Sequence, residues 1–515
     1  MRVAGVPVFL WFAASLGLAM WLPAGFGLLE RDWRSARLFL FAGAFTLFAA
    51  AVLGVAARRA AAPGRGGREE LLTLVGVFAG GPVFAATPIL LLRPDLGPFA
   101  AWFEAAASLS TTGATLLDAA PRALHLWRGL LGWIGGFATL VAVVAVLAPR
   151  ELTDLPGAPP ARESAARVGR ALALGPGGRR TVRAAGTLLP VYLAFTAFLV
   201  VALEALGMPA FEALMLAMGV VSTSGIGPGT TELAMGGEAG RGVEWLLLLA
   251  LLVAANRRHH AWRRGSAGIA AGDVAGTRRR AVGLAALAAD PELRLTAFAL
   301  AAAVAWLWGP GALAAPEGLA GIEAGLVALS GTLVTAVSFL TTTGYGSADW
   351  GAALAWSGLG PGSAGPLLAG LATLGGGVAT TAGGVKLYRA YALYRHGIAE
   401  LARLPHPHLV DSARTMGGSI RRNAVVNAWV ASMLYLAALG ATTLALGAAG
   451  LPLDGALVAA AAALANCGPL LPEAVGTAWA DLPPTARAFA ATAMILGRVE
   501  LVAAVALLNP GWWGR

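Results

Sequence analysis

Residues 341–350 read TTTGYGSADW, and this Gly/Thr-rich stretch decides how the rest of the chain is interpreted. It follows an apolar segment, residues 324–340, that falls short of the roughly 20 residues a helix needs to span a bilayer. A segment too short to cross enters the membrane and turns back, and the irregular backbone after it must be buried in protein. The stretch therefore predicts a re-entrant elbow with non-helical backbone at membrane depth.

The same pattern occurs four times: a spanning segment, a short apolar segment, a Gly-containing break and a second spanning segment. The other breaks read STTGAT at 110–115, STSGIGPG at 222–229 and ANCGPLLPE at 465–473. Their glycines recur about 110 to 125 positions apart, which indicates an internal repeat. The expected spans are residues 71–92, 126–148, 182–206, 243–255, 293–308, 366–385, 424–446 and 488–508, and the other short segments are 99–109, 211–221 and 453–464.

Two further apolar segments, residues 6–28 and 38–57, precede the repeats and predict a hairpin with a retained first helix. The expected fold is an all-α polytopic membrane protein with ten spans. It has an N-terminal two-helix hairpin and four membrane-pore-membrane repeats with pseudo-fourfold symmetry around one central pore. The expected units are residues 1–60 for the hairpin, then 61–150, 151–280, 281–405 with a gating loop, and 406–515 for the repeats.

The composition excludes a soluble protein. Of the 515 residues, 57% are hydrophobic and 12% are charged, and the mean hydropathy is +0.71. The net charge of +10 comes from clusters between the spans, so the positive-inside rule explains it better than a nucleic-acid partner does. That rule places the clusters and both termini in the cytoplasm. The single cysteine, Cys467, excludes an intrachain disulfide.

The breaks carry the groups that hold a dehydrated cation. Threonine and serine supply hydroxyls, and glycine allows backbone conformations that aim consecutive carbonyls inward. The C-terminal end of each short helix adds a negative dipole. Loops or close helix contacts are the alternative for any one cluster, but four clusters behind short segments favour an ion filter. The expected filter residues, and the only expected metal ligands, are Thr111, Thr112, Gly113, Thr223, Ser224, Gly225, Thr342, Thr343, Gly344, Asn466, Cys467 and Gly468.

TTTGYG is similar to the TVGYG filter of potassium channels, and nearly the whole chain resembles the Trk/Ktr/HKT superfamily of potassium transporters, most closely the bacterial TrkH type. The resemblance extends to DPELR at 290–294, LGWIGGF at 131–137, LGRVELVAAVALLNPGWW at 496–513 and the hairpin. It implies a bacterial cytoplasmic (inner) membrane location. It also implies potassium preference, because Gly113 stands where serine marks sodium-selective plant relatives. The fourth break departs from the family pattern at Cys467 and Leu470.

The resemblance also implies a gate. GGGVATTAGGVK, residues 375–386, resembles the family's intramembrane gating loop, and glycines break a helix cheaply and can move. Arg498 lies in an apolar run, where a charge is costly, and corresponds to an arginine below the filter; an ion pair with Glu500 or another helix is the alternative. Lys386 is either part of the gate or a membrane-edge anchor. The expected gating residues are Gly375, Gly376, Gly377, Gly383, Gly384, Lys386 and Arg498.

Several other charged or polar residues have less specific interpretations. Four carboxylates near the pore segments either concentrate cations by their field or are ordinary solvated charges; two of them, Glu104 and Glu212, can also be first-turn charges of the short helices. The four are Glu104, Glu212, Asp349 and Glu473. His259 and His260 are expected at the membrane edge, without a metal role.

The expected function is potassium uptake through a gated filter. Potassium is the only expected bound cofactor, with no organic cofactor in this chain. The expected partners are membrane lipid, a second copy in a homodimer, and a cytosolic nucleotide-binding regulatory subunit of the TrkA type, since the chain has no nucleotide-binding motif of its own. The alternative is a sodium- or proton-coupled symporter, for which inverted repeats and midplane carboxylates would be expected. A membrane enzyme would need a catalytic constellation within the spans, and none is present in the sequence.

Overall fold

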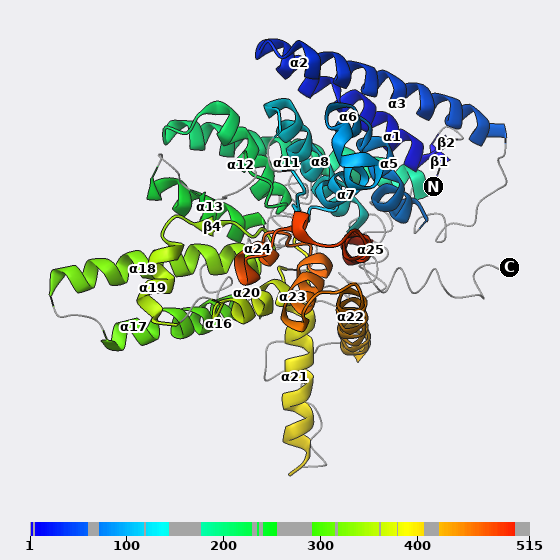
Figure 1. Ribbon diagram of the computed structural model, residues 1–515. Coiled ribbons are helices and arrows are strands. Elements are labelled where there is room, and N and C mark those ends of the chain that lie inside the picture. The colour runs from blue at the N-terminus through cyan, green and yellow to red at the C-terminus, as the bar shows by residue number, and fades with distance from the viewer. Residues whose placement is uncertain are drawn as a thin grey trace, which may run out of the picture.

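The computed structural model describes residues 2–3, 6–59, 72–117, 120–143, 177–228, 234–235, 240–254, 291–314, 318–359, 362–377, 380–405 and 422–499. Helices dominate these ranges (Figure 1), which confirms the all-α expectation. The only strands in the described residues form two short pairs. β1 (Arg2–Val3) pairs antiparallel with β2 (Val6–Pro7), and β3 (Ala234–Met235) pairs parallel with β4 (Gly346–Ser347).

The N-terminal hairpin has two arms. The first arm consists of α1 (Val8–Ala19) and α2 (Trp21–Leu29), and the second arm, α3 (Trp33–Arg59), returns along both. The two arms approach closely because glycines face each other. A Cβ atom added to Gly43 would lie 2.8 Å from the carbonyl oxygen of Gly17, which leaves no room for a side chain. Figure 1 shows the hairpin along one side of the molecule, over the first repeat.

Each repeat contributes a helix that leads into its break, and we call these four helices, α7, α12, α18 and α23, the pore helices. The first repeat contains a helical stretch from Leu72 to Leu92 with η1 (Gly76–Gly80), α5 (Gly81–Ala85) and α6 (Thr87–Leu92), then η2 (Pro94–Leu96), α7 (Gly97–Leu109) and α8 (Arg122–Ala142). The second contains α11 (Gly177–Ala205), α12 (Ala210–Ser222) and α13 (Arg241–Ala254). The third contains α16 (Pro291–Leu307), α17 (Gly309–Ala314), α18 (Leu319–Leu340), α19 (Trp350–Ser357), α20 (Gly365–Leu374) and α21 (Leu387–Arg403). The fourth contains α22 (Arg422–Ala448), α23 (Leu453–Leu464), α24 (Leu470–Val475), η6 (Trp479–Asp481) and α25 (Pro484–Val499).

The pore helix of the third repeat is longer than its sequence pattern predicted. The expected short segment, residues 324–340, is part of α18, which has 22 residues and is long and apolar enough to cross a membrane. The prediction of a short segment is therefore wrong here. The second half of α18 is almost completely buried, whereas the first half exposes Leu319 and Ile322 and receives a hydrogen bond from Trp308 Nε1 at Gly325 O (2.8 Å). The exposed first half of α18 is as apolar as its buried second half, so composition alone does not distinguish the two halves.

The third repeat's return helix is interrupted. Helix α20 ends at Leu374 and α21 begins at Leu387, so residues 366–385 do not form one continuous span. The chain between them doubles back, with hydrogen bonds from Val385 N to Thr373 O (2.9 Å) and from Leu387 N to Gly376 O (3.1 Å). Helix α21 then projects from the body of the molecule (Figure 1).

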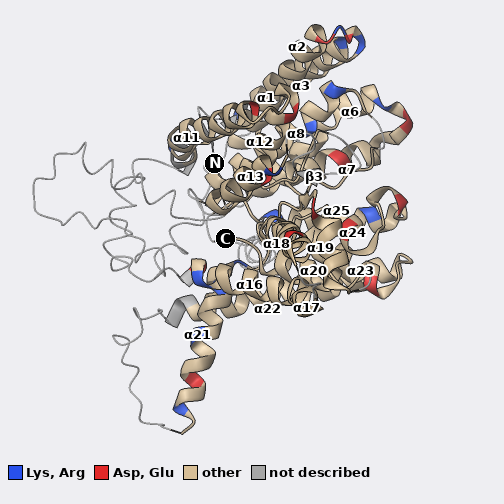
Figure 2. Cartoon of the chain, turned by 90° about the vertical axis from the view of Figure 1, so that its left-hand side faces the viewer, with Lys and Arg blue, Asp and Glu red and all other residues tan. Residues whose placement is uncertain are grey.

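Within the described residues, six helices are long and apolar enough to cross a membrane: Val8–Leu29, Trp33–Arg58, Leu72–Leu92, Thr181–Ala205, Leu319–Leu340 and Val425–Ala448. Of the other expected spans, those at 126–148, 243–255 and 488–508 extend beyond the described residues, the one at 293–308 falls in α16, and the one at 366–385 is interrupted after α20. In Figure 2 several Asp and Glu positions, coloured red, lie near the turns around α2, α7 and α24, whereas α21 projects on the opposite side.

Candidate ion filter and the loop packed against it

The four breaks meet around one common centre. In each segment the glycine leaves no room for a side chain, because the next segment lies against it. An added Cβ atom would come under 3.0 Å from that neighbour, closer than real Cβ contacts: Gly113 against Ser224, Gly225 against Thr343, Gly344 against Pro469, and Gly468 against Thr112. Each segment thus contacts the next and the fourth contacts the first, so the four form a closed ring. We call this arrangement the filter ring.

The four segments leave their pore helices through the same turn. One residue per segment adopts a left-handed conformation that is strained for a non-glycine residue: Thr111 (φ 56°), Thr223 (φ 51°), Thr342 (φ 58°) and Asn466 (φ 54°). The next amide donates back into its pore helix at 2.9 Å in every case: Thr112 to Ala107 O, Ser224 to Gly219 O, Thr343 to Ser338 O, and Cys467 to Ala462 O. The pore-helix carbonyls therefore satisfy these amides. The carbonyl and hydroxyl oxygens of the four segments are the groups that can coordinate a cation.

The fourth segment differs from the other three. Gly113, Gly225 and Gly344 all have positive φ, but Gly468 does not. The amide of Gly468 donates to Thr112 O (2.6 Å), and its carbonyl accepts from Trp479 Nε1 (2.8 Å). The side-chain Nδ2 of buried Asn466 also donates to Thr112 Oγ1 (3.0 Å), so direct hydrogen bonds join the fourth segment to the first.

The tyrosine of the GYG sequence braces a neighbouring segment. Tyr345 is completely buried, and its hydroxyl donates to Ile226 O (3.2 Å) in the second segment. Its backbone amide donates to Ser338 Oγ (2.6 Å) on the third pore helix. The aromatic ring therefore reaches out of its own repeat and packs behind the second segment, where Gly219 makes room for the hydroxyl.

Alanine at Gly219 is expected to impair the filter strongly, because its methyl group would collide with the Tyr345 hydroxyl and with Ile226 O. Overpacking of a buried site costs about 1–3 kcal/mol of stability, and because the displaced Tyr345 hydroxyl no longer braces Ile226 O, we expect roughly a tenfold loss of selective ion flux in proteoliposomes. The matched control is Gly186→Ala, since Gly186 lies in helix α11 with nothing near its Cβ position. Equal selective flux for wild type and Gly219→Ala would contradict this bracing role.

The structure corrects the expectation for Glu104. Its side chain is fully buried in the middle of α7, so it is neither a solvated charge nor a first-turn charge. It forms an ion pair with buried Arg128 (2.5 Å) and accepts a hydrogen bond from Leu116 N (2.8 Å). The other three carboxylates lie nearer the surface: Glu212 in the first turn of α12, Asp349 paired with Arg241 (2.9 Å), and Glu473 exposed on α24.

One functional candidate was missed by the sequence reasoning. Glu244, in the first turn of α13, is 1% exposed and accepts hydrogen bonds from Ser347 Oγ (2.6 Å) and Ala348 N (2.7 Å), just after the third filter segment. The available signal was a lone acidic residue next to the apolar run WLLLLALL. In the sequence, that run has the composition of an ordinary return span.

The glycine-rich loop packs directly against the filter ring. Thr223 Oγ1 donates to Thr381 Oγ1 (3.0 Å), and Gly383 N donates to Thr342 Oγ1 (2.8 Å). A Cβ atom on Gly383 would collide with Ala465 O, so the loop touches the second, third and fourth segments. The first segment is reached through Arg498.

Arg498 links the loop to the first segment. It is 6% exposed, and it donates through Nε to Ser110 O (2.8 Å) and through Nη1 to Thr381 O (2.5 Å). The alternative partner Glu500 lies outside the described residues, as do His259 and His260. With Arg498 included, the loop is joined to all four filter segments.

The remaining expected gating residues shape the loop. Gly375 and Gly384 have φ values of 73° and 77° and lie back to back, an approach that only glycine allows. Gly376 accepts from Leu387 N, and Gly377 accepts from Thr380 Oγ1 (2.7 Å). Lys386 has a positive φ at the start of α21, and its Nζ donates to Ala382 O. It is thus part of the loop's own structure.

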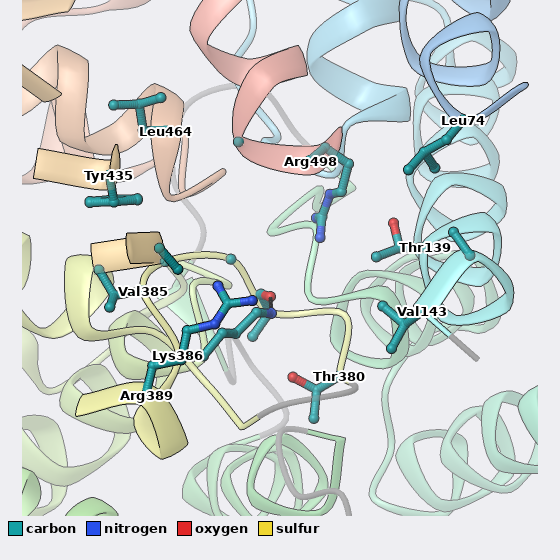
Figure 3. Close-up of a pocket in the computed structure, with 16 residues that line it drawn as sticks. Leu74, Thr139, Val143, Thr380, Val385, Lys386, Arg389, Tyr435, Leu464 and Arg498 are labelled. Atoms are coloured by element: carbon teal, nitrogen blue, oxygen red, sulfur yellow. Dashed lines mark hydrogen bonds between the residues drawn. The ribbon is translucent and has the colours of Figure 1, made fainter. Parts of the chain in front are cut away.

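A pocket lies beside the loop (Figure 3). The loop contributes Thr380 and Lys386, α25 contributes Arg498, and Arg389 comes from the first turn of α21. Three basic side chains line this pocket, and none of its lining residues is acidic. A cation that enters here meets a positive potential. No group of three or more His, Cys, Asp or Glu side chains that could hold a metal ion occurs in the described part of the chain.

Comparisons with known proteins agree with one another. Residues 320–509 match the family model "TrkH: Cation transport protein". The "Trk system potassium uptake protein TrkH" of Halomonas elongata is 28% identical over 477 residues, covering 88% of this chain and 89% of that protein. The protein of the same name from Salmonella typhimurium is 26% identical, with 84% and 83% covered. In fold, the chain is similar over 100% of both chains to the crystal structure of the potassium transporter TrkH from Vibrio parahaemolyticus, with a TM-score of 0.78 and 24% identity.

Proposed function

We propose that this chain is a TrkH-type transporter that carries potassium into a bacterial cell through the filter ring. Its relatives are named as potassium uptake proteins. The observation that carries the proposal is the closed ring of four segments, in which pore-helix carbonyls take up the amides.

The ring would select potassium by replacing its hydration shell. Carbonyl oxygens, together with the hydroxyls of residues such as Thr111, offer several oxygen ligands around one axis. Thr111 Oγ1 is buried and has no hydrogen-bond partner among the described residues, which would leave it available to a cation. Four pore helices direct their negative C-terminal ends toward the ring, which further favours a cation there.

The loop would act as the gate. Its hydrogen bonds to Thr223 and Thr342 place Thr381 and Gly383 against the filter ring, so ions can pass only when the loop withdraws. Arg498 adds a positive charge at the same place and joins the loop to Ser110. Loss of these few hydrogen bonds would release the loop, and its glycines permit the change in backbone conformation.

A cytosolic partner would control the gate through α21. This helix follows the loop directly and projects from the body of the molecule (Figures 1 and 2), so a force applied to it is transmitted to Lys386 and the loop. We propose a TrkA-type nucleotide-binding subunit as that partner, with the chain acting as a homodimer. We propose that α21 lies in the cytoplasm together with both termini, because the positive-inside rule favours that side for its basic residues.

Potassium flux into proteoliposomes that contain only the purified chain tests this function. We expect uptake of potassium driven by its own gradient, with sodium excluded by at least about tenfold, as a carbonyl filter requires. In parallel, expression with its cytosolic partner is expected to restore growth of an uptake-deficient bacterium at low potassium. Uptake that occurs only with an imposed sodium or proton gradient would contradict the proposal and support a coupled symporter.

A further inference from the structure

In two of the four repeats, a buried carboxylate holds the backbone that follows the filter glycine. Glu104 accepts from Leu116 N, three positions after Gly113. Glu244 accepts from Ser347 and Ala348, three and four positions after Gly344. The two carboxylates thus contact the same place in two homologous segments, although they come from different helices.

The two carboxylates differ in their charge compensation. Glu104 has a buried arginine partner, Arg128, at 2.5 Å. Glu244 is 1% exposed, and in the described residues its hydrogen bonds come from a hydroxyl and an amide, while Arg241, one turn earlier, pairs with Asp349. Burial of a carboxylate is costly unless hydrogen bonds compensate it. The hydrogen bonds from Ser347 and Ala348 therefore offset the cost of burying Glu244, and the same hydrogen bonds fix these two residues in place.

Glu244 also bridges two repeats. It starts α13 of the second repeat, but both of its donors belong to the third. The parallel pair of β3 with β4 and the Arg241–Asp349 ion pair join the same two repeats. Within the third repeat, Thr335 Oγ1 accepts from Ser347 N (3.2 Å), so the backbone after Gly344 is fixed from two sides.

We propose that Glu244 is a positioning residue for ion selection, which acts through Ser347 and Ala348 on the third filter segment. Its two oxygens fix where that segment leaves the filter ring and so set the position of the Gly344 carbonyl. Selection by a carbonyl ring depends on where its oxygens are held. This inference rests on the proposed potassium function, and it assigns selectivity to a residue that does not touch the ion.

Glutamine and alanine at position 244 separate positioning from charge. A glutamine oxygen accepts from Ala348 N, and its amide group donates to Ser347 Oγ, which can accept, so both contacts survive without the charge. Alanine loses both contacts. If Glu244 acts by position, Glu244→Gln retains selectivity and Glu244→Ala loses it.

The measurement is the ratio of potassium to sodium flux in proteoliposomes, together with the KM for potassium. We expect Glu244→Ala to lower the ratio about tenfold and to raise the KM, whereas Glu244→Gln stays within about twofold of wild type. Glu204→Ala serves as the matched control, because Glu204 is an exposed carboxylate on α11. If Glu244→Ala does not fold, Ser347→Ala carries the test, with an expected loss of about threefold.

A ratio and KM unchanged in Glu244→Ala would overturn the inference, as would an unchanged ratio in Ser347→Ala. Equal losses in Glu244→Gln and Glu244→Ala would also overturn it, because they would assign the effect to charge. Failure of the proposed function is seen separately, since wild-type protein would then show no preference for potassium in the same vesicles.

Discussion

Serine in place of Gly113 is expected to abolish the preference for potassium over sodium. Gly113 has a φ of 75°, and its Cβ position lies against the carbonyl oxygen of Ser224. A side chain there both strains the backbone, at a cost of about 1–2 kcal/mol, and pushes the first and second segments apart. We expect the displacement of the two segments to lower the flux ratio by about tenfold or more, and each factor of ten corresponds to about 1.4 kcal/mol.

Gly97→Ser is the control for this change. Gly97 starts the same pore helix and has the same φ of 75°, but nothing lies within 4 Å of its Cβ position. It therefore reproduces the backbone strain without the collision in the filter ring. A flux ratio for Gly113→Ser equal to that of Gly97→Ser would contradict the placement of Gly113 in the filter.

Alanine in place of Arg498 is expected to open the gate. The substitution removes the hydrogen bonds to Ser110 O and Thr381 O, and it removes a buried positive charge from the base of the filter ring. Hydrogen bonds of a charged group are worth about 1.5–3 kcal/mol, so the unstimulated potassium flux is expected to rise by about tenfold or more. Proteoliposome flux without the cytosolic partner measures this directly.

Arg487→Ala provides the comparison for Arg498→Ala. Arg487 lies on the same helix and also donates to two backbone carbonyls, Leu482 O and Ala480 O, but it does not contact the loop. Its loss is expected to leave the unstimulated flux unchanged. If the flux of Arg498→Ala stayed at the wild-type level in folded protein, Arg498 would not hold the gate closed.

The repeat and its four breaks were predictable because each break is a local signal. Four such breaks, each after an apolar run, favour re-entrant segments in a membrane, and the α23 bounds, Leu453–Leu464, agree with the sequence pattern. The interruption of the return helix was expected from the family resemblance at residues 375–386, although residues 366–385 had the composition of a span. The left-handed conformation of Asn466 was not, because nothing in the sequence marks it apart from its place in the repeat.

The bracing contacts around the filter could not be predicted from the sequence. Glu104 and Arg128 are partners only because α7 packs against α8, and each looks alone like a surface charge. Glu244 finds its donors in another repeat, more than a hundred positions away. The length of α18 was mispredicted because an apolar extension that faces outward has the same composition as a buried pore helix.

The hydrogen bond from Gly468 N to Thr112 O has a consequence for biosynthesis. The fourth segment is translated last, and its contact with the first segment closes the filter ring. A chain that is still being synthesised therefore has an open ring. If the filter ring selects ions as proposed, a chain that lacks the fourth repeat is expected to lack a selective pore, because the contact that closes the ring is missing.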